Sequence, residues 1–261
     1  MTTQGHVLIT GVIGRIGTAI AQAFLRAGYR ITGIDFRADE LAATVAALGP
    51  PDRVRGRIAD LSDAARVETT FEEAWVDPGP VDVLVNCAAI APVNPVAGMD
   101  PCIWDRVMAV NLRAPVILTS ALAKRVLAAG RTASIVNISS GNALRARAGA
   151  AHYCASKAAV ESLTRSAALE LGPSIRVNAV SPGFVDVDSP VNPVSREYAD
   201  SFPLTPMGRH GTPEDIARAV FWLAGPDAEF CTGTVLRVDG GSLAGLKSLP
   251  VQSRHDGGTP S

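Results

Sequence analysis

The sequence predicts an α/β fold, with a doubly wound parallel sheet of about seven strands in a single domain. Short and almost wholly apolar segments, such as VLIT, VDVLVN and SIVNI, alternate with longer segments of helical pattern. Strands that are apolar on both faces are typical of a parallel sheet covered by helices on both sides. The composition agrees, because 47% of the 261 residues are hydrophobic and 19% are charged, which supports a large core and excludes a disordered chain.

The elements follow one another regularly along the chain. Seven apolar runs are predicted to be strands: His6–Thr10, Arg30–Asp35, Arg53–Ile58, Val81–Asn86, Ala133–Ile138, Ile175–Val180 and Val235–Val238. The segments between them are long enough for crossover helices, which are expected at Thr18–Ala27, Leu41–Leu48, Ala64–Trp75, Ile103–Ala129, Tyr153–Leu171 and Pro213–Ala224. No repeat or flexible linker divides the chain, so residues 1–241 are predicted to form one domain. The proline-rich segment 188–206 is expected to be a lid, and the polar tail 242–261 is expected to be flexible.

Charge and cysteine content narrow the function classes. Lys and Arg number 24 against 25 Asp and Glu, so no excess of positive charge favours nucleic acid or an anionic membrane. The four cysteines form no CxxC pair and have no metal-ligand spacing, which indicates reduced thiols and no metal site. The opening MTTQGHVLIT has no basic segment before a long apolar stretch, and no window approaches 18 uninterrupted apolar residues. We therefore expect a cytoplasmic protein that acts on small molecules.

A glycine-rich turn follows the first predicted strand. TGVIGRIG, residues 10–17, joins that strand to the first helix, and Gly11, Gly14 and Gly17 allow backbone N–H groups to approach a pyrophosphate at the helix N-terminus. A tight turn without a ligand is the alternative. The context favours a dinucleotide site, which would include Arg15 and Ile16.

The second predicted strand ends in Asp35, 18 residues beyond Gly17. A carboxylate at this place accepts hydrogen bonds from the adenosine ribose and repels a 2′-phosphate, so the sequence predicts NAD as the cofactor. A helix-capping or turn role for Asp35 is the alternative. NADP remains an alternative cofactor, because Arg15 or Arg37 could pair with its 2′-phosphate.

Two further polar residues follow strands. Asp60 comes just after the third strand, where it could reach an adenine edge, and Asn86 ends the fourth strand beside the expected nucleotide crevice. Each of them could equally be a loop cap.

The segment YCASK places Tyr153 and Lys157 four residues apart on one helical face. An adjacent ammonium group is expected to lower the pKa of the phenol, which makes the pair a plausible general base. A half-buried tyrosine beside a solvated lysine is the alternative. Ser140 ends the fifth strand, at the edge where open α/β sheets bind ligands, and its hydroxyl could hold a substrate oxygen. Ser139 is its immediate competitor.

Asn111 lies in a long predicted helix, four residues before Pro115. Proline has no N–H, so the carbonyl of residue 111 loses its helical partner. This carbonyl could hold a water that leads to Lys157. An ordinary proline kink is the alternative.

Together these segments resemble the short-chain dehydrogenase/reductase family. The resemblance runs in register over about residues 6–241 and is carried by TGVIGRIG, Asp60-Leu61, Asn86, Asn111, INISS, YCASK, RVNAVSPGFVD and TGTVLRVDGG. It implies a Rossmann fold, a nicotinamide cofactor, a homotetramer and an Asn–Ser–Tyr–Lys tetrad made of Asn111, Ser140, Tyr153 and Lys157. Ser140 is preferred over Ser139 because the family spaces its serine 13 residues before the tyrosine.

The resemblance also implies roles for the site residues. In the family's mechanism Tyr153 removes the hydroxyl proton of an alcohol, Ser140 orients it, and Lys157 lowers the tyrosine pKa and holds the nicotinamide ribose. Residues at the remaining matched positions are expected to contact the cofactor: Leu61, Ala88, Pro182, Gly183 and Val185.

Three departures from the family pattern stand out. The glycine motif reads TGxxGxxG, with Arg15 where the short members have glycine, and it resembles the extended relatives that epimerise or dehydrate sugar nucleotides. The family's NNAG is replaced by Asn86-Cys87-Ala88-Ala89, which removes the backbone freedom of the last glycine. A threonine that commonly bonds the carboxamide is replaced by Val187, so the backbone near Val185 would have to serve.

The sequence thus predicts an NAD(H)-dependent oxidoreductase that acts on a secondary alcohol or ketone. The alternatives are a sugar-nucleotide epimerase or dehydratase, a non-catalytic dinucleotide-binding regulator and a structural oligomer subunit. Specificity is expected from residues 91–104, 141–152 and the lid. Arg145 and Arg147 could receive an anionic substrate or belong to a solvated face.

Overall fold

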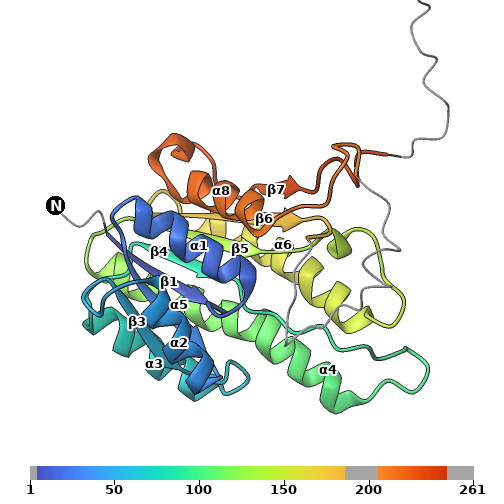
Figure 1. Cartoon of the computed structure of the whole chain (residues 1–261), viewed down its shortest axis with the longest axis horizontal. Helices are drawn as coiled ribbons and strands as arrows, with labels where there is room; N and C mark the ends of the chain where they lie inside the picture. The colour runs from blue at the N-terminus through green and yellow to red at the C-terminus, as the bar shows by residue number, and fades with distance from the viewer. Residues whose placement is uncertain (1–4, 186–204, 246–261) are drawn as a thin grey trace, which may run out of the picture.

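The computed structural model of the protein describes residues 5–185 and 205–245. Its centre is a parallel sheet of seven strands in the order β3-β2-β1-β4-β5-β6-β7 (Figure 1). The strands are β1 His6–Thr10, β2 Arg30–Asp35, β3 Val54–Ile58, β4 Val83–Asn86, β5 Ala133–Ile138, β6 Ile175–Pro182 and β7 Val235–Val238. The sequence-based prediction of a doubly wound parallel sheet is confirmed, and four of the seven strands have the predicted bounds.

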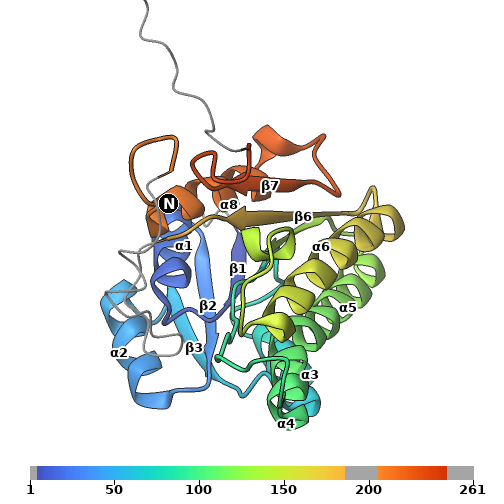
Figure 2. The ribbon, with the colours of Figure 1, turned by 90° about the vertical axis from the view of Figure 1, so that its right-hand side faces the viewer.

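Helices connect the strands and cover both faces of the sheet. The α-helices are α1 Arg15–Arg26, α2 Ala38–Leu48, α3 Ala64–Val76, α4 Pro101–Met108, α5 Ala114–Ala128, α6 Ala151–Leu171 and α8 Pro213–Ala224. Shorter helical turns are η1 Ala109–Arg113, η2 Gly141–Ala143 and η3 Pro226–Ala228. In Figure 2, α1, α2 and α8 lie on one side of the sheet, and α3, α5 and α6 lie on the other.

The alternation of side chains along each strand explains the two layers. Val7 and Ile9 of β1 pack with α1 and α8, whereas Leu8 between them packs with α3 and α5. All three side chains are fully buried. Because successive side chains of a strand point to opposite faces, a strand that is apolar throughout needs a helical layer on each side.

The predicted helix Ile103–Ala129 is in fact three consecutive pieces. Between α4 and α5 the chain makes a π-helical turn, η1, which is centred on Asn111 and ends just before Pro115. A π-bulge inserts an extra residue into a helix where the regular hydrogen bonding is interrupted. The missing N–H of Pro115 is such an interruption, so the expected proline effect takes the form of a π-turn.

By length and composition alone, the helical run 101–128 could cross a membrane, with a mean hydropathy of 1.3 over its most apolar window. However, 56% of that window is buried inside the protein. The run packs on the sheet through buried residues such as Leu118 and Leu122, which is the behaviour of a core helix.

Two predicted segments fall partly outside the described residues. Of the predicted lid, only Thr205 and Pro206 are described, and the departure at Val187 lies outside. Of the predicted flexible tail, residues 242–245 are described, and they form an ordered turn: the Leu243 N–H donates to the Asp239 carboxylate at 2.9 Å.

Candidate active site

The strand order reverses between β1 and β4, and a large cleft opens at the carboxyl ends of the strands there. In an open parallel sheet, ligands bind outside the strand ends at such a switch point. The cleft has a volume of about 1370 Å³, which exceeds the roughly 300–1,000 Å³ of a typical small-molecule site. It therefore has room for a dinucleotide and a substrate together.

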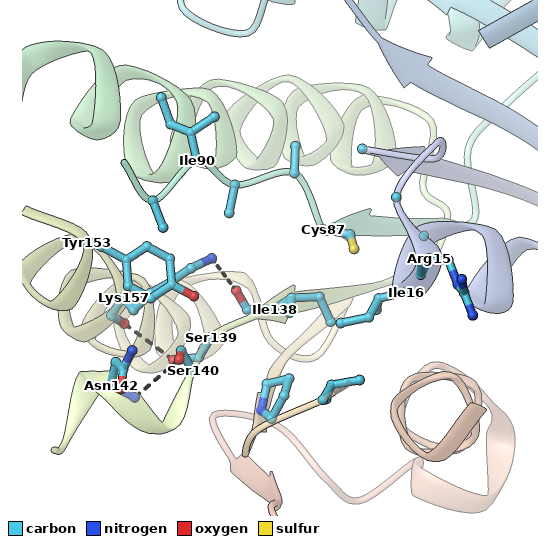
Figure 3. Close-up of a pocket in the computed structure, with 18 of the residues that line it drawn as sticks. Arg15, Ile16, Cys87, Ile90, Ile138, Ser139, Ser140, Asn142, Tyr153 and Lys157 are labelled. Carbon is cyan, nitrogen blue, oxygen red and sulfur yellow. Dashed lines mark hydrogen bonds between the residues drawn. The ribbon is translucent and has the colours of Figure 1, made fainter. Parts of the chain in front are cut away.

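Most of the residues predicted for the site line this cleft. These are Gly11, Gly14, Arg15, Ile16, Gly17, Asp35, Asp60, Leu61, Ala88, Ser140, Tyr153, Lys157, Pro182, Gly183 and Val185. In Figure 3, Arg15 and Ile16 lie at one end of the cleft and Ser140, Tyr153 and Lys157 at the other, with Cys87 between them. Two predicted residues, Asn86 and Asn111, are buried and do not line it.

The glycine turn brings backbone close to backbone. Gly11 has a φ of +70°, and a Cβ there would lie 2.8 Å from the Cα of Ala88. A Cβ on Gly17 would lie 2.3 Å from the Gly11 carbonyl oxygen. Helix α1 begins at Arg15, and its N-cap Gly14 offers no side chain to the first N–H groups. These N–H groups face the cleft end where a diphosphate would fit.

Asp35 lies at the end of β2, 8% exposed, and its Oδ1 accepts a hydrogen bond from the Phe36 N–H at 2.9 Å. Burial raises the pKa of this carboxyl, and the Phe36 hydrogen bond and the Arg37 charge oppose the rise. Helix α2 begins after Arg37 without a side-chain cap, so Asp35 does not cap this helix, whereas its bond to the Phe36 N–H fits the alternative of a turn role. Arg37 binds the Glu40 carboxylate at 2.5 Å and lies 3.9 Å from Asp35.

Asp60 fits both of the roles predicted for it, a cap of the loop and a residue of the cleft. Its Oδ1 accepts hydrogen bonds from the N–H and the hydroxyl of Ser62, each at 2.8 Å, and it also lines the cleft. These hydrogen bonds, together with the charge of Arg106, lower the pKa of Asp60. The carboxylate is therefore both a loop cap and part of the cleft wall.

Asn86 is turned into the interior instead. Its Nδ2 donates to Asn137 Oδ1 at 2.8 Å, and Asn137 in turn donates to Thr164 at 2.9 Å. This polar chain ties β4 to β5 and to α6. The structure therefore gives Asn86 a position behind the cleft, whereas the sequence predicted it at the nucleotide.

The two candidate serines point in different directions. The Ser139 hydroxyl is 2% exposed and donates to the buried Glu161 carboxylate at 2.8 Å. The Ser140 hydroxyl accepts from the Asn142 N–H at 3.1 Å and is hydrogen-bonded to the Tyr153 side chain. Ser140 is therefore the serine beside Tyr153, as the spacing argument predicted.

Tyr153 and Lys157 lie on the same face of α6, with the Lys157 Nζ 5.8 Å from the centre of the tyrosine ring. The ammonium group is 2% exposed and donates to the Ile138 carbonyl at 2.7 Å (Figure 3). Burial lowers the pKa of Lys157 to about 8. A buried lysine stabilised by one carbonyl is held in place but readily loses its proton.

The predicted lowering of the tyrosine pKa by Lys157 is wrong for the protein without a ligand. Burial raises the pKa of Tyr153, and the Ser140 hydrogen bond and the charge of Arg147 only partly oppose it. The reason is that burial removes the phenolate from water, and this loss of hydration outweighs the groups that favour the ionised form.

Asn111 acts through its side chain, which the sequence analysis did not anticipate. Its amide exchanges two hydrogen bonds with the backbone of Ile90, both at 2.9 Å, and donates a third to Ser156 at 3.1 Å. Ser156 donates to the Tyr153 carbonyl at 2.7 Å. Asn111 therefore joins the cleft wall at Ile90 to the helix that carries Tyr153.

Two cleft residues, Ser242 and Leu243, were missed at the sequence level, whereas Asn142 and Thr205 lie in segments that were predicted to set specificity. Leu243 belongs to the segment after β7 and packs close to Gly141. The available signal was topological: β7 is parallel to β6, so the chain that leaves its carboxyl end reaches the same edge of the sheet as the other strand ends.

The described residues suit a nicotinamide dinucleotide. The glycine turn has no room for side chains, the N-terminus of α1 is open, and a carboxylate lies at the end of β2. Among the described residues, no group of three His, Cys, Asp or Glu side chains could hold a metal ion. Hydride transfer needs a cofactor and a proton-transfer group in one cleft, and this cleft fits both. The fold and this cleft together are those of the nicotinamide-dependent oxidoreductases.

Comparison with known proteins gives the family. The family model described as enoyl-(acyl carrier protein) reductase matches residues 11–242. The galactitol 2-dehydrogenase (L-tagatose-forming) of Cereibacter sphaeroides is 38% identical over 240 residues, covering 89% of this chain and 92% of that protein. The sorbitol dehydrogenase of the same organism is 34% identical over 248 residues, covering 90% and 96%.

Solved structures agree. A blue fluorescent protein from a metagenomic library, in complex with NADPH, has a TM-score of 0.82 at 34% identity, with 92% of this chain and 98% of that chain covered. The 3-ketoacyl-(acyl-carrier-protein) reductase from Brucella melitensis, complexed with NADH, has a TM-score of 0.83 at 32% identity, with 92% and 99% covered. The chain belongs to the short-chain dehydrogenase/reductase family. It is a nicotinamide-dependent oxidoreductase that acts on alcohol or ketone substrates.

Proposed function

We propose that this protein is an NAD(H)-dependent dehydrogenase that interconverts a secondary hydroxyl of a polyhydroxylated small molecule and the corresponding ketone. The observation that carries the proposal is that Ser140, Tyr153 and Lys157 line the same cleft as the glycine turn and Asp35. Two relatives are named for galactitol and sorbitol, and both compounds are polyols. These names support a polyol-like substrate.

The residues of the chain handle the proton and the orientation of the substrate. The nicotinamide, when bound, accepts the hydride of the alcohol or returns it to the ketone. The ionised Tyr153 oxygen accepts the hydroxyl proton, and the Ser140 hydroxyl donates a hydrogen bond to the same substrate oxygen. Lys157, fixed by the Ile138 carbonyl at 2.7 Å, supplies the positive charge that favours the tyrosinate. Asn111 keeps the helix of Tyr153 fixed to the cleft wall.

The preference for NAD over NADP rests on Asp35. Its carboxylate would lie against a 2′-phosphate, and Arg37 is already bound to Glu40 at 2.5 Å. Arg15 is an exposed cation in the cleft beside the glycine turn, and it favours the opposite preference. We give Asp35 the larger weight because burial makes an uncompensated contact between two anions costly.

Comparing the two cofactors tests this preference. We expect kcat/KM with NAD⁺ to exceed that with NADP⁺ at least about tenfold, since one decade corresponds to about 1.4 kcal/mol. Asp35→Ala is expected to relax the preference, and Asp39→Ala, a nearby exposed acid outside the cleft, serves as the matched control. Equal use of both cofactors by the unaltered protein would contradict the assignment.

The activity itself is tested with a panel of polyols, hydroxy acids and other secondary alcohols, following the reduction of NAD⁺. Stoichiometric formation of NADH and ketone is the expected result. A sugar-nucleotide epimerase would instead convert its substrate without net NADH. A regulator would bind NADH and turn over no alcohol.

The proposal extends to a cytoplasmic homotetramer that binds neither membrane nor nucleic acid. Exposed apolar side chains on two neighbouring helices support self-association: Val116 and Leu127 of α5 are 41% and 53% exposed, and Leu169 of α6 is 87% exposed. Light scattering coupled to gel filtration measures the assembly. Cell fractionation tests the location, for which the balanced charge and isolated cysteines are the support.

A further inference from the structure

Tyr153, Lys157 and Glu161 follow one another at intervals of four residues along α6. This spacing puts the three side chains on one face of the helix. Tyr153 and Lys157 line the cleft, whereas Glu161 does not. The side chain of Glu161 is 7% exposed, so a carboxyl group is kept inside the protein directly behind the proton-transfer pair.

Stability alone does not explain a carboxyl group at this buried position. Moving an ionised carboxylate out of water costs several kcal/mol, and a hydrogen bond from one hydroxyl offsets only part of this cost. Other buried positions of the same helix carry apolar residues such as Val160 and Ala168. The presence of Glu161 is therefore better explained by the group that its side chain contacts.

That group is the hydroxyl of Ser139, which comes directly after β5. The hydroxyl is buried and donates to Glu161 Oε1 at 2.8 Å. Hydrogen bonds to a carboxylate are among the stronger ones in a protein interior. The Ser139 N–H donates to the Val180 carbonyl at 2.8 Å. Ser139 is therefore held by β6 through its backbone and by α6 through its side chain.

Ser139 lies between the two residues of this segment that the catalytic pair contacts. Immediately before it, the Ile138 carbonyl accepts from the Lys157 Nζ at 2.7 Å. Immediately after it, Ser140 is hydrogen-bonded to the Tyr153 side chain. Figure 3 shows these three consecutive residues beside the helix that carries the pair. One face of α6 thus contacts three consecutive residues at the end of β5.

We propose that Glu161 is a positioning residue for the reaction: by holding Ser139, it fixes the Ser140 hydroxyl relative to the Tyr153 oxygen. This proposal rests on the proposed function, which requires both of these oxygens to bind the same substrate oxygen. A displacement of about 1 Å in such a site can cost about 10²-fold in rate. Glu161 therefore acts on the reaction through Ser139, without contact to the substrate or the cofactor.

Substitutions at both ends of the hydrogen bond test the proposal. Glu161→Ala and Ser139→Ala should each lower kcat about tenfold, with the alcohol of the panel that is oxidised fastest, and should change NADH affinity less than about twofold. Glu161→Gln keeps an acceptor for the hydroxyl and should restore kcat to within about threefold of the wild type. Because both alanine substitutions remove the same contact, the double variant should lose no more kcat than either single variant.

The pH dependence of kcat gives a readout that a general loosening of the fold would not move. The hydrogen bond with Ser140 lowers the pKa of Tyr153, so a displaced Ser140 leaves this pKa higher. The rise of kcat with pH should therefore move to higher pH in Glu161→Ala. It should stay at the wild-type position in Glu161→Gln.

Thr164 provides a matched control on the same helix, three residues beyond Glu161. Its hydroxyl is buried and accepts a hydrogen bond from the Asn137 side chain of β5 at 2.9 Å. Thr164→Val removes a buried contact between the same two elements, outside the cleft. It should lower the melting temperature, as the loss of a buried hydrogen bond does, and leave kcat and its pH profile unchanged.

The proposal is overturned if Glu161→Ala keeps the kcat and the pH profile of the wild type, if Glu161→Gln falls as far as Glu161→Ala, or if Thr164→Val loses as much activity. Should Glu161→Ala fail to fold, Ser139→Ala and Glu161→Gln give the same comparison. A wild-type protein that binds NADH but oxidises no alcohol of the panel would overturn the proposed function, and this inference with it.

Discussion

Burial acts in opposite directions on the two titratable side chains of the catalytic pair. It raises the pKa of Tyr153 and lowers the pKa of Lys157 to about 8, because in both cases the neutral form tolerates the apolar surroundings better. A tyrosinate beside an ammonium is therefore a state that the protein alone does not favour. The Ser140 hydrogen bond and the charge of Arg147 favour the ionised phenol, and a charge that arrives with the ligands has to supply the rest of the stabilisation.

The buried charge of Lys157 predicts how stability depends on pH. The folded-state pKa of about 8 lies below the unfolded value of about 10.4, so the unfolded chain binds more protons between these values. The destabilisation caused by Lys157 is therefore complete below pH 8 and disappears as the pH rises towards 10.4. In the absence of cofactor, the unfolding free energy of the wild type should rise relative to Lys157→Met by about 2 kcal/mol between pH 7.5 and 9.5.

Chemical denaturation at a series of pH values measures this difference. Lys157→Met also removes the donor to the Ile138 carbonyl, and this loss adds a constant that does not vary with pH. A difference that stays flat over the interval would show that Lys157 keeps its ordinary pKa in the folded protein.

Tyr153→Phe separates binding from chemistry. The ring and its packing remain, so affinity for NADH should be retained, whereas alcohol oxidation should fall by at least about 10²-fold, the low end for a lost acid–base group. NADH fluorescence titration and steady-state kinetics give the two readouts. Near-normal oxidation by this variant would refute the role of Tyr153, and Ser139→Ala provides a comparison at a serine that faces away from the tyrosine.

At the scale of elements, the glycine turn and α1 form one tightly packed unit. Alanine favours a helix over glycine by up to about 1 kcal/mol, so Gly17→Ala would stabilise an isolated helix. In this protein the new Cβ would lie 2.3 Å from the Gly11 carbonyl oxygen, and backbone cannot move aside as a side chain can. Overpacking of this kind costs about 1–3 kcal/mol, so the clash outweighs the gain.

Gly17→Ala is accordingly expected to lower the melting temperature and to weaken NADH binding at least about tenfold, since the turn must open at the diphosphate site. Gly49→Ala is the matched control, because its Cβ would meet only the Val54 side chain at 3.4 Å. Unchanged NADH affinity in Gly17→Ala would show that the turn is not part of the binding site.

The elements differ in how far the sequence could predict them. Strands such as β1 and β5 were predicted with their observed bounds, because unbroken apolar runs between glycine and polar segments leave few alternatives. The π-turn at Asn111 was not predicted. Pro115 signals that helical hydrogen bonding is interrupted there, but whether the chain kinks or takes up an extra residue depends on packing against other elements.

The residues of the candidate site also differ in how far the sequence could predict their positions. Residues that end a strand or begin a helix, such as Asp35 and Ser140, were placed in the cleft correctly because topology decides their position. Asn86 also ends a strand, yet its side chain turns into the core to reach Asn137. That choice depends on which neighbour offers a partner, as do the long-range bonds of Asn111 to Ile90.

For the whole molecule, the parallel sheet explains why distant segments meet at the site. All seven strands run in the same direction, so the chain leaves each of them at one edge. The glycine turn follows β1, Ser140 follows β5, and the segment from Asp239 to Gly245 follows β7. The last of these segments closes the cleft wall beside the loop of Ser140.

This closure predicts where the chain can be shortened. Truncation after Gly241 removes Ser242 and Leu243, which line the cleft, and should weaken binding of NADH, of substrate or of both by several-fold. Truncation after Gly245 keeps these residues and the Leu243 N–H bond to the Asp239 carboxylate at 2.9 Å. The remaining residues, 246–261, are mostly polar and are expected to be dispensable for binding.

The comparison of the two truncated proteins therefore separates a cleft wall from a surface tail. NADH fluorescence titration and kcat/KM for an alcohol are measured on both, with thermal unfolding as a check that each is folded. Loss of the Leu243 side chain alone, in Leu243→Ala, should reproduce part of the effect of the shorter truncation, because this side chain packs against Gly141 beside Ser140. If both truncated proteins bind and turn over normally, the segment after Gly241 contributes nothing to the site.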